Sequence, residues 1–295
     1  MRPQFLFSGM ETEFVEKPTN VASAPQRSPF RYPGGKTWLV PRFRQWMRSF
    51  EIAPKLFVDP FTGGGILPLT AAFENFAEKI IMVELDTQIA AVWQTILSED
   101  FEWLCTQIMD FEMTSDSVKR VLETKTCSTR ERGFQTILKN RTAHGGILAD
   151  GAGIIKNGEN GKGIISRWYP RTITERIKAI HAVSAKIKFF CMDGFDLIEK
   201  HLSDPTAVFF IDPPYTAGGK KAGARLYNHY EIDHGRLFQL CGDVIGDFLM
   251  TYDNADEVCA LAGRYGFKTR AISMKNTHHT KMNELLIGKN LDWVN

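Results

Sequence analysis

AVFFIDPPYT, residues 207–216, is the stretch on which the predicted fold depends. Its apolar half, Ala207 to Ile211, predicts a buried strand that ends on the motif DPPY at residues 212–215. Ligands of open α/β sheets bind at the carboxyl ends of the strands. Two prolines fix φ and prevent further pairing with a neighbouring strand, so the backbone carbonyls at this end are held rigidly as hydrogen-bond acceptors. A planar base with an exocyclic amine suits such a site, and a plain strand-end turn is the alternative.

The rest of the chain repeats the order of strand, turn and helix. Strands are expected at 55–59, 79–83, 186–191, 207–211, 247–252, 267–274 and 284–287. Helices are expected at 37–50, 66–76, 88–97, 101–109, 130–140, 172–185, 195–201 and 255–265, and one more begins at Asp233. Strands and helices alternate until the last two strands. The sequence therefore predicts an α/β fold with a mostly parallel seven-stranded sheet that ends in a hairpin.

The composition is that of an ordinary globular chain. Its 295 residues are enough for a full core, with 43% hydrophobic and 24% charged residues. No apolar run approaches the roughly 18–20 residues of a membrane span, and the apolar start of the chain is too short for a signal peptide. The five cysteines form no CxxC pair and the seven histidines show no ligand spacing. We therefore expect reduced thiols in a cytoplasmic protein that needs no metal.

The charge is unevenly distributed along the chain. Residues 117–188 hold fifteen lysines and arginines against five acidic residues, whereas the remainder holds 21 against 29. Such a basic segment is typical of polyanion binding, and a solvated charged surface is the alternative. Its glycine-rich centre, 144–166, predicts hairpins or a mobile loop. The mixture of charges and rings at Arg167–Arg171 suits contact with DNA.

Two glycine-containing turns precede the DPPY motif. RYPGGK, residues 31–36, permits close approach of a ligand but lacks P-loop spacing, which argues against nucleotide hydrolysis. DPFTGGG, residues 59–65, joins a strand to a helix, an arrangement that brings a helix N-terminus to a ligand. The next strand ends before Glu84, which can accept hydrogen bonds from ribose hydroxyls. Asp193 also follows a strand, and helix capping is its alternative role. Together these features predict an adenosine-type cofactor site.

These motifs and their order resemble those of the Dam-like (D12 class) DNA adenine-N6 methyltransferases. RYPGGK, DPFTGGG, a basic insert, DPPY and NELLIG at 283–288 follow one another over about residues 28–289. The resemblance implies a Rossmann-like seven-stranded methyltransferase sheet with an inserted, mainly helical target-recognition region. It divides the chain into a flexible arm at 1–25, an S-adenosylmethionine-dependent methyltransferase domain at 26–110 and 186–295, and a DNA-recognition insert at 111–185.

The resemblance also implies which residues act. S-Adenosyl-L-methionine would be held by Tyr32, Lys36, Phe61, Gly63, Gly65, Glu84 and Asp193. Catalysis would rest on Asp212, Pro213, Pro214 and Tyr215. In this arrangement Asp212 and the Pro213 carbonyl accept hydrogen bonds from the adenine amine, and Tyr215 stacks on the base. DNA contacts would come from Asn140, Arg141, Lys156, Lys162, Arg167 and Arg171.

The expected function is site-specific methylation of adenine N6 in double-stranded DNA, on a base flipped out of the duplex. The insert has GGILAD at 145–150 where relatives commonly show Asn-Gly, Arg and Asn, so the target sequence does not carry over. The alternatives are cytosine-N4 methylation, a DNA-binding module with a decayed site, and methylation of an RNA base or a protein glutamine. The resemblance implies a bacterial or phage-encoded cytoplasmic protein with a cognate restriction endonuclease as its candidate partner. Residues 216–225 form a candidate lid.

Overall fold

The computed structural model describes residues 24–149, 151–215, 226–229, 231–275 and 281–294. The predicted lid at 216–225 and nearly all of the predicted arm lie outside these ranges. The seven strands are β1 (Leu56–Asp59), β2 (Lys79–Val83), β3 (Ile187–Phe190), β4 (Ala207–Ile211), β5 (Asp247–Asp253), β6 (Lys268–Lys275) and β7 (Lys281–Gly288). Each lies at or within a few residues of its predicted position.

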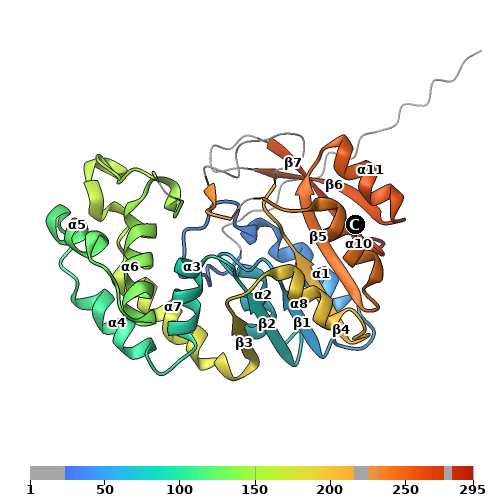
Figure 1. Cartoon of the computed structure of the whole chain (residues 1–295), viewed down its shortest axis with the longest axis horizontal. Helices are drawn as coiled ribbons and strands as arrows, with labels where there is room; N and C mark the ends of the chain where they lie inside the picture. Colours follow the sequence, from blue (N-terminus) through green and yellow to red (C-terminus); the bar gives the residue numbers. More distant parts are fainter. Residues whose placement is uncertain (1–23, 150, 216–225, 230, 276–280, 295) are drawn as a thin grey trace, which may run out of the picture.

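The strands form one sheet in the order β3-β2-β1-β4-β5-β7-β6 (Figure 1). β1 pairs in parallel with β2 and with β4, and β4 pairs in parallel with β5. β7 runs antiparallel to both of its neighbours, β5 and β6, so the last two strands form the expected hairpin. This order confirms the predicted Rossmann-like methyltransferase sheet.

Helices cover both faces of the sheet (Figure 1). The described helices are α1 (Val40–Arg48), α2 (Ile66–Phe73), α3 (Thr87–Ile96), α4 (Phe101–Asp110), α5 (Ser115–Glu123), α6 (Thr129–Thr142), α7 (Pro170–Ala182), α8 (Gly194–His201), α10 (His234–Asp243) and α11 (Asp256–Arg264). Successive side chains of a strand point to opposite faces. Phe57 accordingly joins the core beneath α1, α2 and α3, whereas Val58 joins the core beneath α8, α10 and α11.

The inserted region is a helical body beside the sheet, formed by α4 to α7 (Figure 1). It joins the sheet through α3, which packs against α6. α4, which the predicted division places with the sheet, packs against α6 and α7. The glycine-rich centre contains short 3-10 turns at Glu159–Gly161 and Gly163–Arg167 and a bridge between Ala143 and Ile154. α5 was not among the predicted helices.

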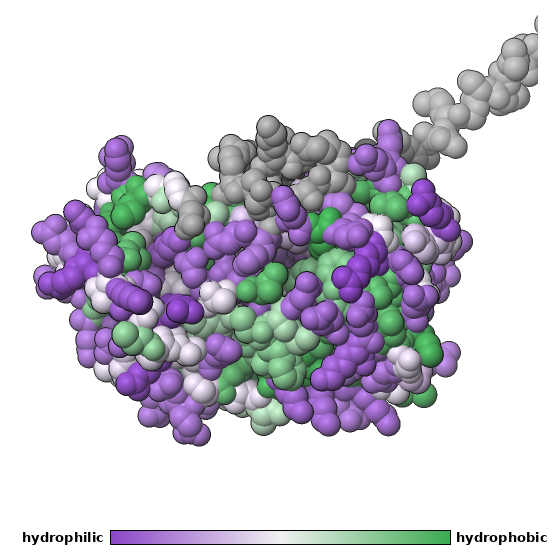
Figure 2. Space-filling view, in the orientation of Figure 1, coloured by the Kyte–Doolittle hydropathy of each residue, from purple (hydrophilic) through white to green (hydrophobic). Residues whose placement is uncertain are grey.

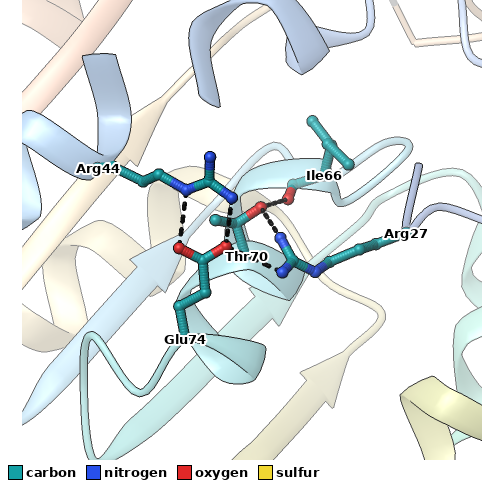
Figure 3. Close-up of polar contacts among 5 residues, drawn as sticks. All are labelled: Arg27, Arg44, Ile66, Thr70 and Glu74. Atoms are coloured by element: carbon teal, nitrogen blue, oxygen red, sulfur yellow. Dashed lines mark hydrogen bonds and ion pairs between the residues drawn. The ribbon is translucent and has the colours of Figure 1, made fainter. Parts of the chain in front are cut away.

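The start of the described chain is fixed to α2 and α1 (Figure 3). The guanidinium of Arg27 donates to Thr70 Oγ1 at 3.1 Å and to Glu74 Oε1 at 2.9 Å. Arg44 donates two hydrogen bonds to the same carboxylate, at 2.7 and 2.8 Å. Thr70 in turn donates to the carbonyl of Ile66 at 2.7 Å. This network fixes the segment that precedes RYPGGK, and that motif lines the cavity described below.

Across the described ranges, no helix combines the length and the apolar character needed to cross a membrane.

Candidate functional site

A cavity of about 700 Å³ opens at the carboxyl ends of β1, β2 and β4. Because β1 pairs with both neighbours, the residues at the ends of these strands are brought to one edge. The sequence assigned eleven residues to cofactor binding or catalysis, and all of them line this cavity: Tyr32, Lys36, Phe61, Gly63, Gly65, Glu84, Asp193, Asp212, Pro213, Pro214 and Tyr215. Their placement together is therefore as expected, while their individual roles remain predictions.

Asp212 is held by three side chains. Its Oδ1 accepts hydrogen bonds from the hydroxyls of Tyr215 and Thr251, both at 2.7 Å. Its Oδ2 pairs with the ammonium of Lys36 at 2.9 Å. A carboxylate offers about four lone-pair positions, so these partners leave one position on Oδ2 for a further donor. Asp212 is thus oriented rigidly and can still accept one N–H.

Lys36 is a buried cation with two acidic neighbours. Its ammonium lies 2.9 Å from Asp212 and 3.9 Å from Glu284, and it donates to the carbonyl of Gly34 at 2.9 Å. Burial opposes the charge, but Asp212 and Glu284 outweigh it and raise the pKa of Lys36 above its usual value. The side chain therefore stays charged. Its ammonium is engaged by Asp212 in this structure, so its predicted contact with the cofactor has no geometric support here.

Tyr215 stacks on another ring as well as binding Asp212. Its ring lies 5.6 Å from that of Tyr252 at an interplanar angle of 22°. The Tyr252 hydroxyl lies 2.8 Å from Nδ1 of His234. Burial, and then the charge of Asp212, raise the pKa of Tyr215 well above its usual value, so its hydroxyl remains a donor. These contacts hold the ring in the cavity, where the predicted stacking on a base would occur.

The glycine turn after β1 approaches two large rings. Gly63 and Gly65 have positive φ angles of 45° and 66°. A Cβ at Gly63 would lie 2.6 Å from the ring of Tyr32, and one at Gly65 would lie 2.7 Å from Trp93. The indole N–H of Trp93 donates to the Gly63 carbonyl at 3.0 Å. Glycine is required at both positions by conformation and by space.

Glu84 follows β2 and faces the glycine turn. Its carboxylate accepts hydrogen bonds from the backbone N–H of Gly63 and of Asp86, both at 3.0 Å. Burial is the main reason that the pKa of Glu84 rises to about 7. The backbone donors, among them also Leu85, fix the carboxylate, and its remaining lone-pair capacity is available to a ribose hydroxyl.

Asp193 and Phe61 form the wall near α8. The carboxylate of Asp193 accepts from the backbone N–H of Phe195 at 2.8 Å and caps α8. The side chain is exposed and also lines the cavity, so both roles considered for it are geometrically compatible. The ring of Phe61 meets that of Phe195 edge to face, at 6.2 Å.

The cavity is predominantly acidic. Its described carboxylates are Asp59, Glu84, Asp86, Asp193, Asp212, Glu231, Asp253 and Glu284, against the cations Lys36, Arg31 and Arg176. Negative charge at close range favours a cationic ligand. The sulfonium of S-adenosylmethionine meets this requirement, and the carboxylate oxygens of Glu84 can accept hydrogen bonds from its ribose hydroxyls. The residues present therefore fit that cofactor.

Four further residues of this site were missed by the sequence reasoning: Tyr227, Asn228, Thr251 and Glu284. The amide of Asn228 donates to Asp86 at 2.7 Å, and the hydroxyl of Tyr227 donates to the Pro33 carbonyl at 3.1 Å. Sequence spacing holds no signal for either contact. Glu284 had a signal in the sequence, because it is an acidic residue next to the apolar run at 285–287. In the structure it is only 8% exposed, and one of its oxygens has no hydrogen-bond partner among the described residues.

The predicted DNA-binding residues separate into two groups. Lys156, Lys162 and Arg171 are exposed and Arg167 is half-buried, whereas Asn140 and Arg141 are only 1% and 4% exposed. Hydrophilic side chains gather over the helical body that carries them (Figure 2).

Asn140 and Arg141 are engaged within the protein. Asn140 binds both backbone groups of Arg31, and Arg141 donates to the carbonyl of Pro29. These burials and contacts argue against direct DNA binding by the two side chains. We therefore correct their assignment: Asn140 and Arg141 hold the insert against residues 29–31, at the start of RYPGGK.

Comparison with known proteins gives a distant likeness only. No protein-family model and no curated protein sequence matches the chain. Among solved structures, PH1948 of Pyrococcus horikoshii, a candidate RNA methyltransferase, is similar at 11% identity with a TM-score of 0.40, over 88% of this chain and 85% of that one. The rRNA methyltransferase AviRa of Streptomyces viridochromogenes is similar at 14% identity with a TM-score of 0.40, over 88% and 86%. So distant a likeness carries no argument about substrate, and the fold assignment rests on the sheet order.

Proposed function

We propose that this protein is a site-specific DNA adenine-N6 methyltransferase that uses S-adenosylmethionine. The observation that carries the proposal is the shared cavity, in which the acceptor Asp212 and the glycine turn with Glu84 meet. An enzyme that methylates an amine needs the acceptor for the amine and the binding site for the methyl donor in one cavity, because the two reactants must be aligned. The assignment to adenine rests on the family resemblance.

The cofactor supplies a methyl group made electrophilic by the sulfonium. The work of the protein is then to position the adenine amine and to support the change at its nitrogen. The free lone-pair position on Asp212 Oδ2 would accept one amine N–H, and the Pro213 carbonyl would accept the other. Both contacts favour a tetrahedral nitrogen whose lone pair is directed at the methyl group. Preorganised acceptors of this kind typically contribute about 10²–10³ in rate.

Lys36 and Glu284 would adjust Asp212 during this step. An amine that approaches Oδ2 competes with the ammonium of Lys36, which lies 2.9 Å from it. Glu284 lies 3.9 Å from the same ammonium and offers an alternative partner. A shift of Lys36 toward Glu284 would leave Asp212 as the stronger acceptor, so that it could take the proton that the methylated amine must lose.

The target base would be flipped out of the duplex, at a cost of a few kcal/mol. The basic insert lies beside the cavity and would hold the phosphates during this opening. A restriction endonuclease partner belongs to the same proposal.

The test is the identity of the methylated nucleoside. DNA from cells that express the protein is digested to nucleosides and compared with DNA from cells that express Asp212→Asn at an equal level. We expect N6-methyladenine with the wild type and none above background with the variant, while cofactor binding by the variant persists. N4-methylcytosine alone would contradict the adenine assignment. Methylation of RNA, with none of DNA, would contradict the proposal as a whole.

A further inference from the structure

A second cavity, of about 470 Å³, lies on the insert side of Arg31. Its polar lining includes Arg31, His144, Lys156, Ser166 and Arg167, and we call it the arginine pocket. Arg31 also lines the acidic cavity, so the two spaces adjoin at this residue. The mechanism proposed above makes no use of Arg31 or Ser166.

Like charges are crowded around this pocket. Burial lowers the pKa of Arg31, and the nearby charge of Arg167 lowers it further. Burial likewise lowers the pKa of Arg141 to about 10, and the charges of Arg176 and Arg31 add to the effect. Holding guanidinium groups together in partly dry surroundings costs free energy unless an anion offsets the charge.

Two residues that line the pocket have a polar atom with no hydrogen-bond partner within the described part of the chain, Arg31 Nη1 and Ser166 Oγ, as has Arg141 Nε outside the lining. Ser166 is only 4% exposed, and it lines the pocket. Buried donors are almost always paired in folded proteins, so each orphan calls for an explanation. Arg31 and Ser166 both line the pocket, so an oxyanion bound there would offer acceptors to their side chains.

The pocket is built into the fold. The Arg31 backbone is clamped by Asn140, through Arg31 N–H to Oδ1 at 2.9 Å and Nδ2–H to the Arg31 carbonyl at 3.0 Å. The Asn140 amide also donates to the carbonyl of Gly146 at 2.7 Å. A Cβ at Gly146 would lie 2.1 Å from the Arg31 carbonyl oxygen, so the insert approaches more closely than any side chain would allow. Arg31 is therefore presented to the pocket from a fixed backbone.

We propose that the arginine pocket binds a phosphate of the DNA backbone next to the flipped base, with Arg31 and Ser166 as its direct ligands. The proposal rests on the proposed function for the identity of the polymer. Arg167 and Lys156 add charge at the rim. Because Arg31 borders both cavities, a phosphate held here would lie beside the entrance through which the base reaches Asp212. The pocket would thus fix the register of the backbone and carry no sequence information.

The experiment measures DNA affinity as a function of salt. A short fluorescein-labelled DNA duplex is titrated with wild type, Arg31→Met, Arg31→Lys and Ser166→Ala in the presence of S-adenosylhomocysteine, and anisotropy is recorded at several NaCl concentrations. Lys55→Met is the matched control, because Lys55 is exposed at the opposite end of β1. One lost phosphate contact reduces the slope of log K against log salt by about one.

We expect Arg31→Met to lose that unit of slope and about tenfold in affinity, with the larger deficit at low salt. Arg31→Lys keeps the charge and therefore the slope, but it binds more weakly because an ammonium cannot make the two parallel hydrogen bonds of a guanidinium. Ser166→Ala weakens binding without changing the slope. The melting temperature of Arg31→Met should not fall, because the substitution removes an uncompensated charge.

An unchanged slope and affinity of Arg31→Met relative to Lys55→Met would overturn the proposal. So would a fall in its melting temperature that accounts for the lost binding. If inorganic phosphate raises the melting temperature of the wild type, but Arg31→Met binds DNA with an unchanged salt slope, the pocket is a site for a free anion. Binding to an RNA duplex only would assign another polymer. If the wild type methylates DNA but Arg31→Met has the same salt slope as the wild type, only the phosphate site is wrong. If Arg31→Met has a smaller slope but the wild type methylates no DNA, only the proposed function is wrong.

Discussion

The acidic cavity and the arginine pocket adjoin at Arg31 and differ in how their charges are balanced. In the acidic cavity, the cation Lys36 lies between two carboxylates and is neutralised within the protein. In the arginine pocket, burial and then the charge of Arg167 lower the pKa of Arg31, and the side chains of Arg31 and Ser166 each have a buried polar atom without a partner among the described residues. The first region keeps an excess of carboxylates, and one oxygen of Glu284 in it has no hydrogen-bond partner among the described residues, so it suits a cationic ligand. The second holds an excess of cations, which a bound anion would offset.

Replacement of Lys36 by Met would break this balance in the acidic cavity. Asp212 and Glu284 would then lose the cation that both of them face, in a site where the side chains are 20% and 10% exposed. Breaking a buried ion pair typically costs about 3–5 kcal/mol. Denaturant unfolding should show a loss of this size for Lys36→Met. Lys55→Met, which removes an exposed lysine, should stay within about 0.5 kcal/mol of wild type. Equal stability of the two variants would contradict the assigned ion pair.

Replacement of Glu84 by Gln tests whether this carboxylate makes cofactor affinity depend on pH. Because burial raises the pKa of Glu84 to about 7, its carboxylate gains a proton as pH falls through 7. The protonated group has lost its charge and one acceptor position, so cofactor affinity should fall below pH 7, by up to about tenfold per pH unit. Glu84→Gln should bind the cofactor about 10–100-fold more weakly at pH 8 and show a flat profile.

The matched control is Glu284→Gln. The pKa of Glu284 is also raised to about 7, chiefly by burial, but Glu284 faces Lys36 and not the glycine turn. Its substitution should leave the pH dependence of cofactor binding in place. If cofactor affinity were independent of pH in Glu284→Gln and dependent on pH in Glu84→Gln, then Glu284 and not Glu84 would be the group that binds the cofactor. Isothermal titration with S-adenosylhomocysteine between pH 6 and 8 makes both measurements.

Replacement of Asn140 by Ala would separate the two regions at their shared boundary. Its side chain makes three hydrogen bonds, two to the Arg31 backbone and one to the Gly146 carbonyl, and it is 1% exposed. Leaving such backbone groups unpaired should cost about 1–3 kcal/mol. DNA affinity should fall with it, because Arg31 is no longer fixed, whereas cofactor affinity should change little. A loss of cofactor binding larger than that of DNA binding would contradict this division.

The smallest expected effect lies at the anchor of the described N-terminal segment. Glu74 receives hydrogen bonds from Arg27 and Arg44, and these three side chains are 15–25% exposed (Figure 3). Glu74→Gln keeps the shape and weakens charge-assisted bonds that are partly screened by water. We expect a loss of about 1 kcal/mol and a melting temperature lower by about 2–4 °C. Unchanged DNA and cofactor affinities at low temperature would show that the anchor acts on stability alone.

Much of the fold was predictable because the strands and helices carry their signal locally. AVFFI is apolar throughout since β4 is buried on both faces, and the glycine turn after β1 precedes a helix as expected. α5 was missed although its sequence, SDSVKRVLE, carries a helix signal: Thr114 caps it, and Val118, Val121 and Leu122 have the spacing of one helix face.

The site was predictable where motifs lie at strand ends and unpredictable where distant segments meet. Asn140 and Arg141 lie within a basic segment, which predicts a surface position. They are buried because the segment at residues 29–31 packs against them. Arg31 and Asn140, for example, are 109 residues apart in the sequence. Thr251 lies within an apolar strand and has the character of a core residue until β4 and β5 are paired. Such contacts follow from tertiary packing and have no local signature.

The central claim is that Asp212 accepts the amine of an adenine taken from duplex DNA. Sequencing of DNA for modified positions, after expression of wild type or Asp212→Asn, tests it most directly. The account predicts N6-methyladenine at one short recurring sequence with the wild type and none with the variant. Unmodified adenines with a folded, cofactor-binding wild type, or the same modified positions with Asp212→Asn, would contradict it.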